Sequence, residues 1–202
     1  MQKYSQEYLW LIEEYKNLHQ KGVNKITASQ TFKGRSLEKW IIIIRDIVIR
    51  YKINSLIDFG CGKAHFYFNK LKLKDKITKQ KKIYKNVTDY WGIKDYVLYD
   101  PGVIEFSKFP NSQKDLVICT DVMEHIPSQD TIKLLTDIYE LANKAVFFAI
   151  EINNVSNKTL SDGRDVHINL REKEEWNEIF KNITKKFPKI HSSINFVETT
   201  RS

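Results

Sequence analysis

The chain has 202 residues, of which 42% are apolar and 12% aromatic. This length suits one α/β domain and is short for two, and the apolar content excludes general disorder. The net charge is +8, and lysines are concentrated in the block from Lys70 to Lys85, which contains one acidic residue. We expect a single domain over residues 1–202, divided into N-terminal helices (1–54), a core (55–151) and a C-terminal part (152–202).

Three features bear on the cellular location. The first 20 residues mix polar and aromatic side chains and lack the apolar block of a signal peptide. The longest apolar run, residues 41–49, is interrupted by Arg45 and Asp46 and is far shorter than the roughly 20 residues of a membrane span. The two cysteines, Cys61 and Cys119, do not form a metal-type pair. We therefore expect a cytoplasmic protein with reduced thiols and no membrane partner.

The spacing of apolar residues predicts two helices before the core. Apolar side chains recur at intervals of three and four between residues 8 and 15, which predicts a helix over residues 4–19 that stops near Gly22. A second helix is predicted to follow Ser36 and to continue to Tyr51.

Four short apolar runs predict buried strands in the core, and each run ends near a carboxylate. The runs cover residues 55–59, 96–99, 116–120 and 145–150. The carboxylates are those of Asp58, Asp100, Asp121 and Glu151. A helix is predicted over residues 129–143, before the fourth strand. Strands that alternate with helices imply a parallel sheet with helices on its faces.

The C-terminal part is predicted to complete the sheet. Residues 166–170 alternate like a strand, residues 172–185 have helical spacing, and residues 190–198 are compatible with a final strand. We expect these two strands to form an antiparallel pair. The predicted fold class is therefore α/β, with a mostly parallel sheet and an antiparallel C-terminal strand pair.

The turn after the first strand indicates what the sheet binds. In an open parallel sheet, ligands bind beyond the carboxyl ends of the strands, so the strand-end aspartates are expected to converge on one site. Gly60 and Gly62 allow a tight turn and a close approach of ligand to backbone. His65 stands where the dinucleotide fingerprint G-x-G-x-x-G requires a third glycine, which disfavours a nicotinamide or flavin enzyme.

Three segments in chain order carry recognisable motifs. They are residues 57–64 (IDFGCGKA), residues 98–101 (LYDP) and residues 115–127 (DLVICTDVMEHIP). These segments resemble the motifs of class I S-adenosylmethionine-dependent methyltransferases, and the resemblance covers roughly residues 55–151. It implies a Rossmann-like methyltransferase fold in which this core binds S-adenosylmethionine.

The resemblance also implies the cofactor-binding residues, which are Asp58, Phe59, Gly60, Gly62, Asp100 and Asp121. Asp100 would accept both ribose hydroxyls in charge-assisted hydrogen bonds, and Asp58 would act near the amino acid portion, directly or through water. Capping of the strand end is the structural alternative for both residues. Asp121 is equally compatible with a cofactor contact and with capping the helix that begins near Glu124.

The sequence departs from the family pattern on both sides of Asp100. The stretch from Asp58 to Asp100 is longer than usual and contains the lysine block, whereas fourteen residues separate Asp100 from Asp115. Fourteen residues are too few for a helix, a strand and another helix, so we expect the third strand and its helix to be reduced. The adenine contact is therefore not placed. Phe106 could supply a stacking surface or belong to the core.

Three segments are candidates for the acceptor side of the site. His125 follows the Asp121 strand end, and His167 lies in a polar loop after the Glu151 strand end. Each is a candidate general base or acceptor-positioning group, and each could instead be structural. Residues 32–36 could close over the cofactor or simply lead into the second helix.

The expected reaction is transfer of a methyl group to an oxygen or nitrogen of a small-molecule or sugar-type acceptor, without a metal. Nucleic acid is the alternative acceptor, and it depends on the block from Lys70 to Lys85, which we otherwise expect to be a solvated helix or loop. Residues 120–123 (TDVM) lack the Pro-Pro-aromatic pattern that accompanies methylation of exocyclic base amines in related families. A non-catalytic cofactor-binding protein is the remaining alternative, since fold alone does not establish activity.

Overall fold

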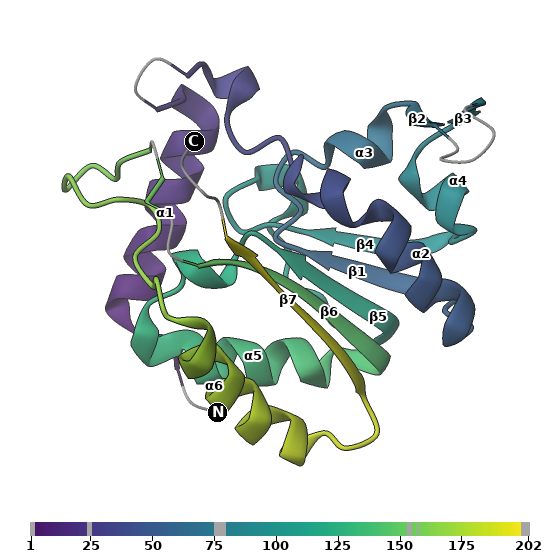
Figure 1. Cartoon of the computed structure of the whole chain (residues 1–202). Coiled ribbons are helices and arrows are strands. Elements are labelled where there is room, and N and C mark those ends of the chain that lie inside the picture. Colours follow the sequence, from purple (N-terminus) through teal and green to yellow (C-terminus); the bar gives the residue numbers. More distant parts are fainter. Residues whose placement is uncertain (1–2, 24–25, 75–79, 153–154, 157, 199–202) are drawn as a thin grey trace.

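Five strands form one parallel sheet in the computed structural model (Figure 1), which describes residues 3–23, 26–74, 80–152, 155–156 and 158–198. The strands are β1 (Ser55–Phe59), β4 (Asp95–Tyr99), β5 (Lys114–Thr120), β6 (Ala142–Ile152) and β7 (His191–Glu198). Their order across the sheet is β4-β1-β5-β6-β7, and all four pairings are parallel. The predicted α/β class and the four predicted core strands are confirmed.

Both faces of β1, β4, β5 and β6 are covered, because alternate side chains of these strands enter two different cores. In β6, for example, Phe148 packs into one core and Phe147 into the other. Helices α5 (Thr131–Glu140) and α6 (Lys173–Lys186) cover the first core, and α2 (Ile41–Arg50) and α4 (Val87–Trp91) cover the second (Figure 1). Burial on both faces explains why these strands read as continuous apolar runs in the sequence.

The helices lie within a few residues of their predicted positions. Helix α1 (Gln6–Lys21) starts after Ser5, whose hydroxyl accepts a hydrogen bond from the amide of Tyr8, and ends at Gly22. It lies beyond the carboxyl ends of the strands (Figure 1). The remaining helical segments are α3 (His65–Phe68) and the 3₁₀ turns η1 (Ala28–Gln30), η2 (Ser36–Trp40), η3 (Ile104–Phe106), η4 (Met123–His125) and η5 (Ser128–Asp130). None of the helices in the described residues is long and apolar enough to cross a membrane.

The predicted antiparallel C-terminal pair is wrong. Strand β7 pairs with β6 in parallel, in continuous register from Ala145 and His191 to Ile152 and Glu198. Helix α6 connects the two strands, and a helical crossover of this kind returns the chain to the same end of the sheet. Residues 166–170 form no strand. Their alternation reflects anchoring to η4 instead, because the amide of Asn169 donates to the carbonyl of Glu124 at 2.9 Å.

The antiparallel pair of this fold lies in the lysine block, which we expected to be a helix or a loop. Strands β2 (Leu71–Lys74) and β3 (Lys81–Tyr84) form a two-stranded sheet of their own, apart from the main sheet (Figure 1). The lysines of the block that lie in the described residues are all exposed, and they are Lys70, Lys72, Lys74, Lys81, Lys82 and Lys85. Lys76 and Lys79 lie outside the described residues. Between β4 and β5, where every residue is described, the chain forms only η3, so the predicted reduction of this region is confirmed.

Candidate functional site

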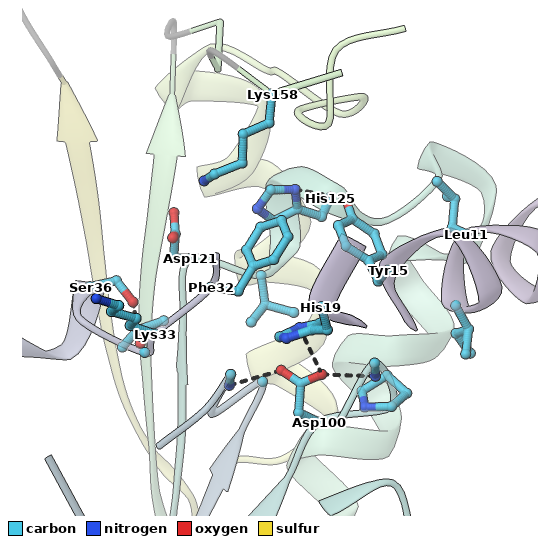
Figure 2. Close-up of a pocket in the computed structure, with 18 of the residues that line it drawn as sticks. Leu11, Tyr15, His19, Phe32, Lys33, Ser36, Asp100, Asp121, His125 and Lys158 are labelled. Atoms are coloured by element: carbon cyan, nitrogen blue, oxygen red, sulfur yellow. Dashed lines mark hydrogen bonds and ion pairs between the residues drawn. The ribbon is translucent and has the colours of Figure 1, made fainter. Parts of the chain in front are cut away.

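A cavity of about 310 Å³ opens at the carboxyl ends of β1, β4 and β5. Helix α1 forms one wall of it, and residues 32–36 form another. Figure 2 shows His19 and Asp100 at one end of this cavity and Asp121, His125 and Lys158 at the other. The volume lies in the range of small-molecule sites, and the position is the one expected for ligands of an open α/β sheet.

The glycine turn after β1 forms the floor of the cavity. Gly60 and Gly62 both line it, with φ angles of 84° and 55°. A Cβ atom on Gly60 would lie 2.2 Å from a methyl group of Val122, and one on Gly62 would lie 2.4 Å from the carbonyl oxygen of Phe32. The turn therefore has no room for larger residues, as the sequence predicted.

Asp100 projects into the cavity from the end of β4 and is held by backbone amides. Its Oδ2 accepts a hydrogen bond from the amide of Gly62 at 2.8 Å, and its Oδ1 accepts one from the amide of Gly102 at 2.9 Å (Figure 2). Burial raises the pKa of this carboxyl, although the backbone donors oppose the change. Each oxygen keeps a second acceptor position, so Asp100 can still bind hydroxyl groups of a ligand.

His19 is a site residue that sequence reasoning missed. Its Nε2 lies 3.8 Å from Oδ1 of Asp100, and its buried Nδ1 has no hydrogen-bond partner. Burial, and then the nearby Lys63 ammonium, lower its pKa to about 4, so the ring is neutral near pH 7. The sequence does contain one signal for its burial. His19 lies four residues after Tyr15 and so extends the helical spacing of the apolar residues between 8 and 15.

Asp58 and Phe59 lie behind the wall of the cavity and do not line it. Asp58 is 3% exposed, its Oδ1 has no hydrogen-bond partner, and burial raises its pKa to about 7. Phe59 packs against Tyr99, with the ring centroids 4.7 Å apart. Both residues support the turn from the core side, and their predicted contact with the cofactor stays a prediction.

The structure brings Asp121, His125 and His167 together at the other end of the cavity, which Asp121 and His125 line and His167 does not. One side-chain oxygen or nitrogen atom from each residue lies within 4.8 Å of those of the other two. Asp121 is exposed, with a φ angle of 62°, and His125 is buried. The two imidazole rings are 4.7 Å apart at an angle of 68°. The sequence predicted all three residues but not their mutual proximity.

The orientation of His125 is fixed by the loop that carries His167. Its Nδ1 lies 2.9 Å from the carbonyl oxygen of Val166 and 2.9 Å from the hydroxyl of Tyr15. A carbonyl can only accept, so Nδ1 carries the proton and the free lone pair is on Nε2. Burial lowers the pKa of His125 to about 4, against the opposing effect of Asp121.

Residues 32–36 pack directly over the glycine turn. The carbonyl of Phe32 accepts from the amide of Lys63 at 2.9 Å, and that of Lys33 accepts from the amide of His65 at 3.0 Å. Residues 32–36 line the cavity and also lead into η2. A role beside the cofactor and a role as the lead-in to the second helix are therefore compatible. Phe106 does not line the cavity, because it stacks on Phe68 with the rings 6.2 Å apart.

Comparison with known proteins places this fold and site in a family. A family model described as a methyltransferase domain matches residues 19–185. The match includes the glycine turn, Asp100, Asp121 and both candidate histidines. No curated protein and no solved structure gives a significant match. The matched region spans most of the chain, so the protein belongs to the methyltransferase domain family, as its resemblance to the class I enzymes predicted.

Proposed function

We propose that the protein transfers a methyl group from S-adenosylmethionine to an oxygen or nitrogen of a small-molecule or sugar-type acceptor. The observation that carries this proposal is the meeting of Asp100 with the Gly60 to Gly62 turn in one cavity at the strand ends. Family membership supports methyl transfer in general. The cofactor and the acceptor class are inferred from the chemistry of the cavity.

The residues of the cavity fit the charged and polar groups of this cofactor. Asp100 would accept hydrogen bonds from the ribose hydroxyls through its remaining lone pairs. Lys33 and Arg35 line the same cavity and would neutralise the carboxylate of the amino acid portion. Asp58 would act on that portion from behind the turn. Asp121 would lie near the sulfonium end, where a negative charge favours the cation.

The acceptor would enter at the end of the cavity that contains His125. When bound, the cofactor supplies an electrophilic methyl group, which an acceptor oxygen or nitrogen attacks while the carbon–sulfur bond breaks. Holding the acceptor in line is worth about 7 to 11 kcal/mol of barrier, and a general base would add about 10² to 10⁴-fold. With a pKa of about 4, His125 is a weak base near neutral pH, so we assign it a positioning role and keep His167 as the candidate base.

A small acceptor fits the apolar side of the cavity. Tyr8, Leu11, Ile12 and Tyr15 of α1 line this side, and polar and charged side chains such as Asp100, Asp121 and His125 line the rest of the cavity. Pockets of this kind bind small molecules by burying most of their surface and orienting them through a few polar contacts.

Calorimetry with S-adenosylmethionine and S-adenosylhomocysteine tests the proposal. Asp100→Ala should weaken binding at least about tenfold, because one charged hydrogen bond contributes about 1.5 to 3 kcal/mol. Asp95→Ala is the matched control, since Asp95 lies at the opposite end of β4 and is 61% exposed in an ion pair with Lys114. Asp100→Asn is a second variant, and its unfolding is compared with that of wild type. This comparison separates a loss of cofactor binding from a loss of stability. Absence of cofactor binding by the folded wild-type protein would refute the proposal.

Methylation of nucleic acid is the second candidate, and it rests on the exposure of every described lysine of the β2–β3 pair. If this surface binds duplex DNA, the logarithm of the binding affinity should fall linearly with the logarithm of salt concentration, with a slope of about −0.9 for each phosphate contacted. No binding at low salt would eliminate this candidate. A non-catalytic role is eliminated by S-adenosylhomocysteine formation in the presence of any acceptor.

A further inference from the structure

We infer that Asp121, His125 and His167 form a binding site for a divalent transition-metal ion, at the acceptor end of the cavity. A carboxylate and two imidazoles are the ligands that zinc, manganese and iron(II) accept in proteins. Three protein ligands also leave coordination positions open for water or for a hydroxyl group. The inference concerns ion binding and stands independently of methyl transfer.

The spacing of the three side chains is close to that of a formed site. Their candidate ligand atoms lie within 4.8 Å of one another. Around an ion at about 2.0 to 2.2 Å, ligand atoms in tetrahedral geometry would be about 3.3 Å apart. Contraction by up to about 1.5 Å is therefore required. Asp121 is exposed and His167 partly exposed, so both side chains have room to move.

His125 is oriented as metal-bound histidines usually are. Its Nδ1 is committed to the carbonyl of Val166, and this leaves the Nε2 lone pair for the ion. Tyr15 reinforces the arrangement, since its hydroxyl also contacts both Nδ1 and the Val166 carbonyl, at 2.9 and 3.1 Å. His167 follows Val166 directly, so one backbone segment both orients His125 and delivers the second imidazole.

A buried glutamate beside the cluster adds a carboxyl group whose charge a bound cation would balance. Glu124 is 0% exposed, and its Oε1 accepts a hydrogen bond from the amide of Glu151 at 2.9 Å. Its Oε2 is buried without a partner. Glu124 and Asp121 line a common small cavity of about 50 Å³, and within the described part of the chain neither makes an ion pair with a basic side chain. Two such carboxylates at close range repel each other unless a cation lies near or one of them holds a proton.

Lys158 is the protein's own cation near this cluster and would compete with a metal ion. Figure 2 shows it pointing toward the space beside Asp121 and His125. Its ammonium lies 4.6 Å above the ring of Phe32, so it is held by the aromatic face rather than by an ion pair with Asp121. Lys158 can therefore withdraw toward solvent without breaking an ion pair with Asp121.

If the proposed methyl transfer is correct, the ion has a definite use. It would bind an acceptor hydroxyl in an open coordination position and favour its deprotonated form, as metal ions do for bound water, and the ion would then replace His167 as the group that activates the acceptor. This consequence rests on the proposed function. It narrows the acceptor class to molecules with a hydroxyl group that reaches the His125 end of the cavity.

Equilibrium dialysis with Zn²⁺ alone, and electron paramagnetic resonance with Mn²⁺ alone, test the inference without cofactor or acceptor. Wild-type protein should bind one ion. Asp121→Asn and His167→Gln should each weaken ion binding at least about tenfold, because even the loss of a residue that only supports a metal ligand has an effect of this size. Lys158→Met should tighten binding, because it removes a competing cation. His65→Gln is the control, since His65 lies in α3 outside the cluster.

The outcomes separate this inference from the proposed function. Absence of Zn²⁺ and Mn²⁺ binding at millimolar concentration would overturn it, even if the protein binds S-adenosylmethionine. Binding that survives both Asp121→Asn and His167→Gln would overturn it as well, because the ion would then lie elsewhere. Neither substitution alters a buried side chain, and thermal unfolding of each variant verifies that it is folded.

Discussion

Replacing Gly62 by alanine tests whether the Phe32 segment packs onto the turn after β1. Gly62 has a φ angle of 55°, and a Cβ atom there would lie 2.4 Å from the carbonyl oxygen of Phe32 and 3.0 Å from the amide nitrogen of Gly34. Both neighbours are backbone atoms, so neither can rotate away as a side chain would. Gly92 has a φ angle of 76°, and no atom of the described residues lies within 4 Å of an added Cβ. Gly92→Ala is therefore a matched control that introduces backbone strain alone.

The expected difference between the two variants follows from these contacts. The left-handed conformation costs an alanine about 1 to 2 kcal/mol at either position. At Gly62 the overlap with backbone adds about 1 to 3 kcal/mol, the usual effect of overpacking. Urea unfolding should therefore show a lower free energy of unfolding for Gly62→Ala than for Gly92→Ala by that amount, with similar m values. Equal losses in the two variants would refute the packing of residues 32–34 over this turn.

Two further predictions concern buried carboxyl groups. Burial raises the pKa of Asp58 from 3.8 to about 7, so the folded state holds this proton more tightly and the wild-type protein loses stability as pH rises through that range. Urea unfolding at pH 4 and at pH 8 should therefore show that the stability of Asp58→Asn relative to wild type increases between the two, by up to about 4 kcal/mol. A difference that does not depend on pH would contradict the raised pKa. Asp130 is 4% exposed and accepts hydrogen bonds from the amide and hydroxyl of Ser5, so Asp130→Ala should lower the free energy of unfolding by about 2 to 4 kcal/mol and loosen α1. Glu13→Ala is the control, because Glu13 forms an exposed ion pair with Lys16 and its loss should cost under about 1 kcal/mol. Similar losses of stability in the two variants would contradict the anchoring of α1 by Asp130.

The parallel core could be predicted from sequence because local pattern and tertiary environment agree there. Apolar runs ending at a carboxylate predicted the positions of β1, β4, β5 and β6, although β5 and β6 begin earlier than predicted, since a strand buried on both faces has no polar alternation. The glycine turn was equally predictable, because the contacts of Gly60 and Gly62 exclude a Cβ at both positions.

The pairing of the last strand could not be predicted in the same way. Residues 190–198 read correctly as a strand, but direction depends on the connection before them. The alternating residues 166–170 suggested a partner strand, whereas contacts with η4 and α5 fix this segment. Asn169, for example, donates to the carbonyl of Met123 and to the hydroxyl of Thr131. Alternation reports which side chains are buried, not what they pack against.

The candidate site was predicted in parts, and its missing parts come from distant segments. His19 and Tyr15 belong to the apolar spacing of α1, which shows a buried face but gives no indication that this face would lie against the strand ends. Lys158 belongs to a loop without any periodic pattern. Such residues become neighbours only through the tertiary packing of α1 and of the loop after β6, and no local spacing encodes that packing.

The two ends of the cavity are held by different kinds of structure, and this has a consequence for specificity. At the Asp100 end, the carboxylate is fixed by the backbone amides of Gly62 and Gly102, which side-chain substitution leaves in place. At the His125 end, the geometry depends on side chains and on one loop, anchored by Val166 and Asn169. Substitutions in that loop should therefore alter acceptor or ion binding while cofactor affinity changes little, because Val166 and Asn169 form hydrogen bonds with residues of the His125 end, such as His125 and Glu124. A half of the cavity defined by backbone and a half defined by side chains can therefore change independently of each other.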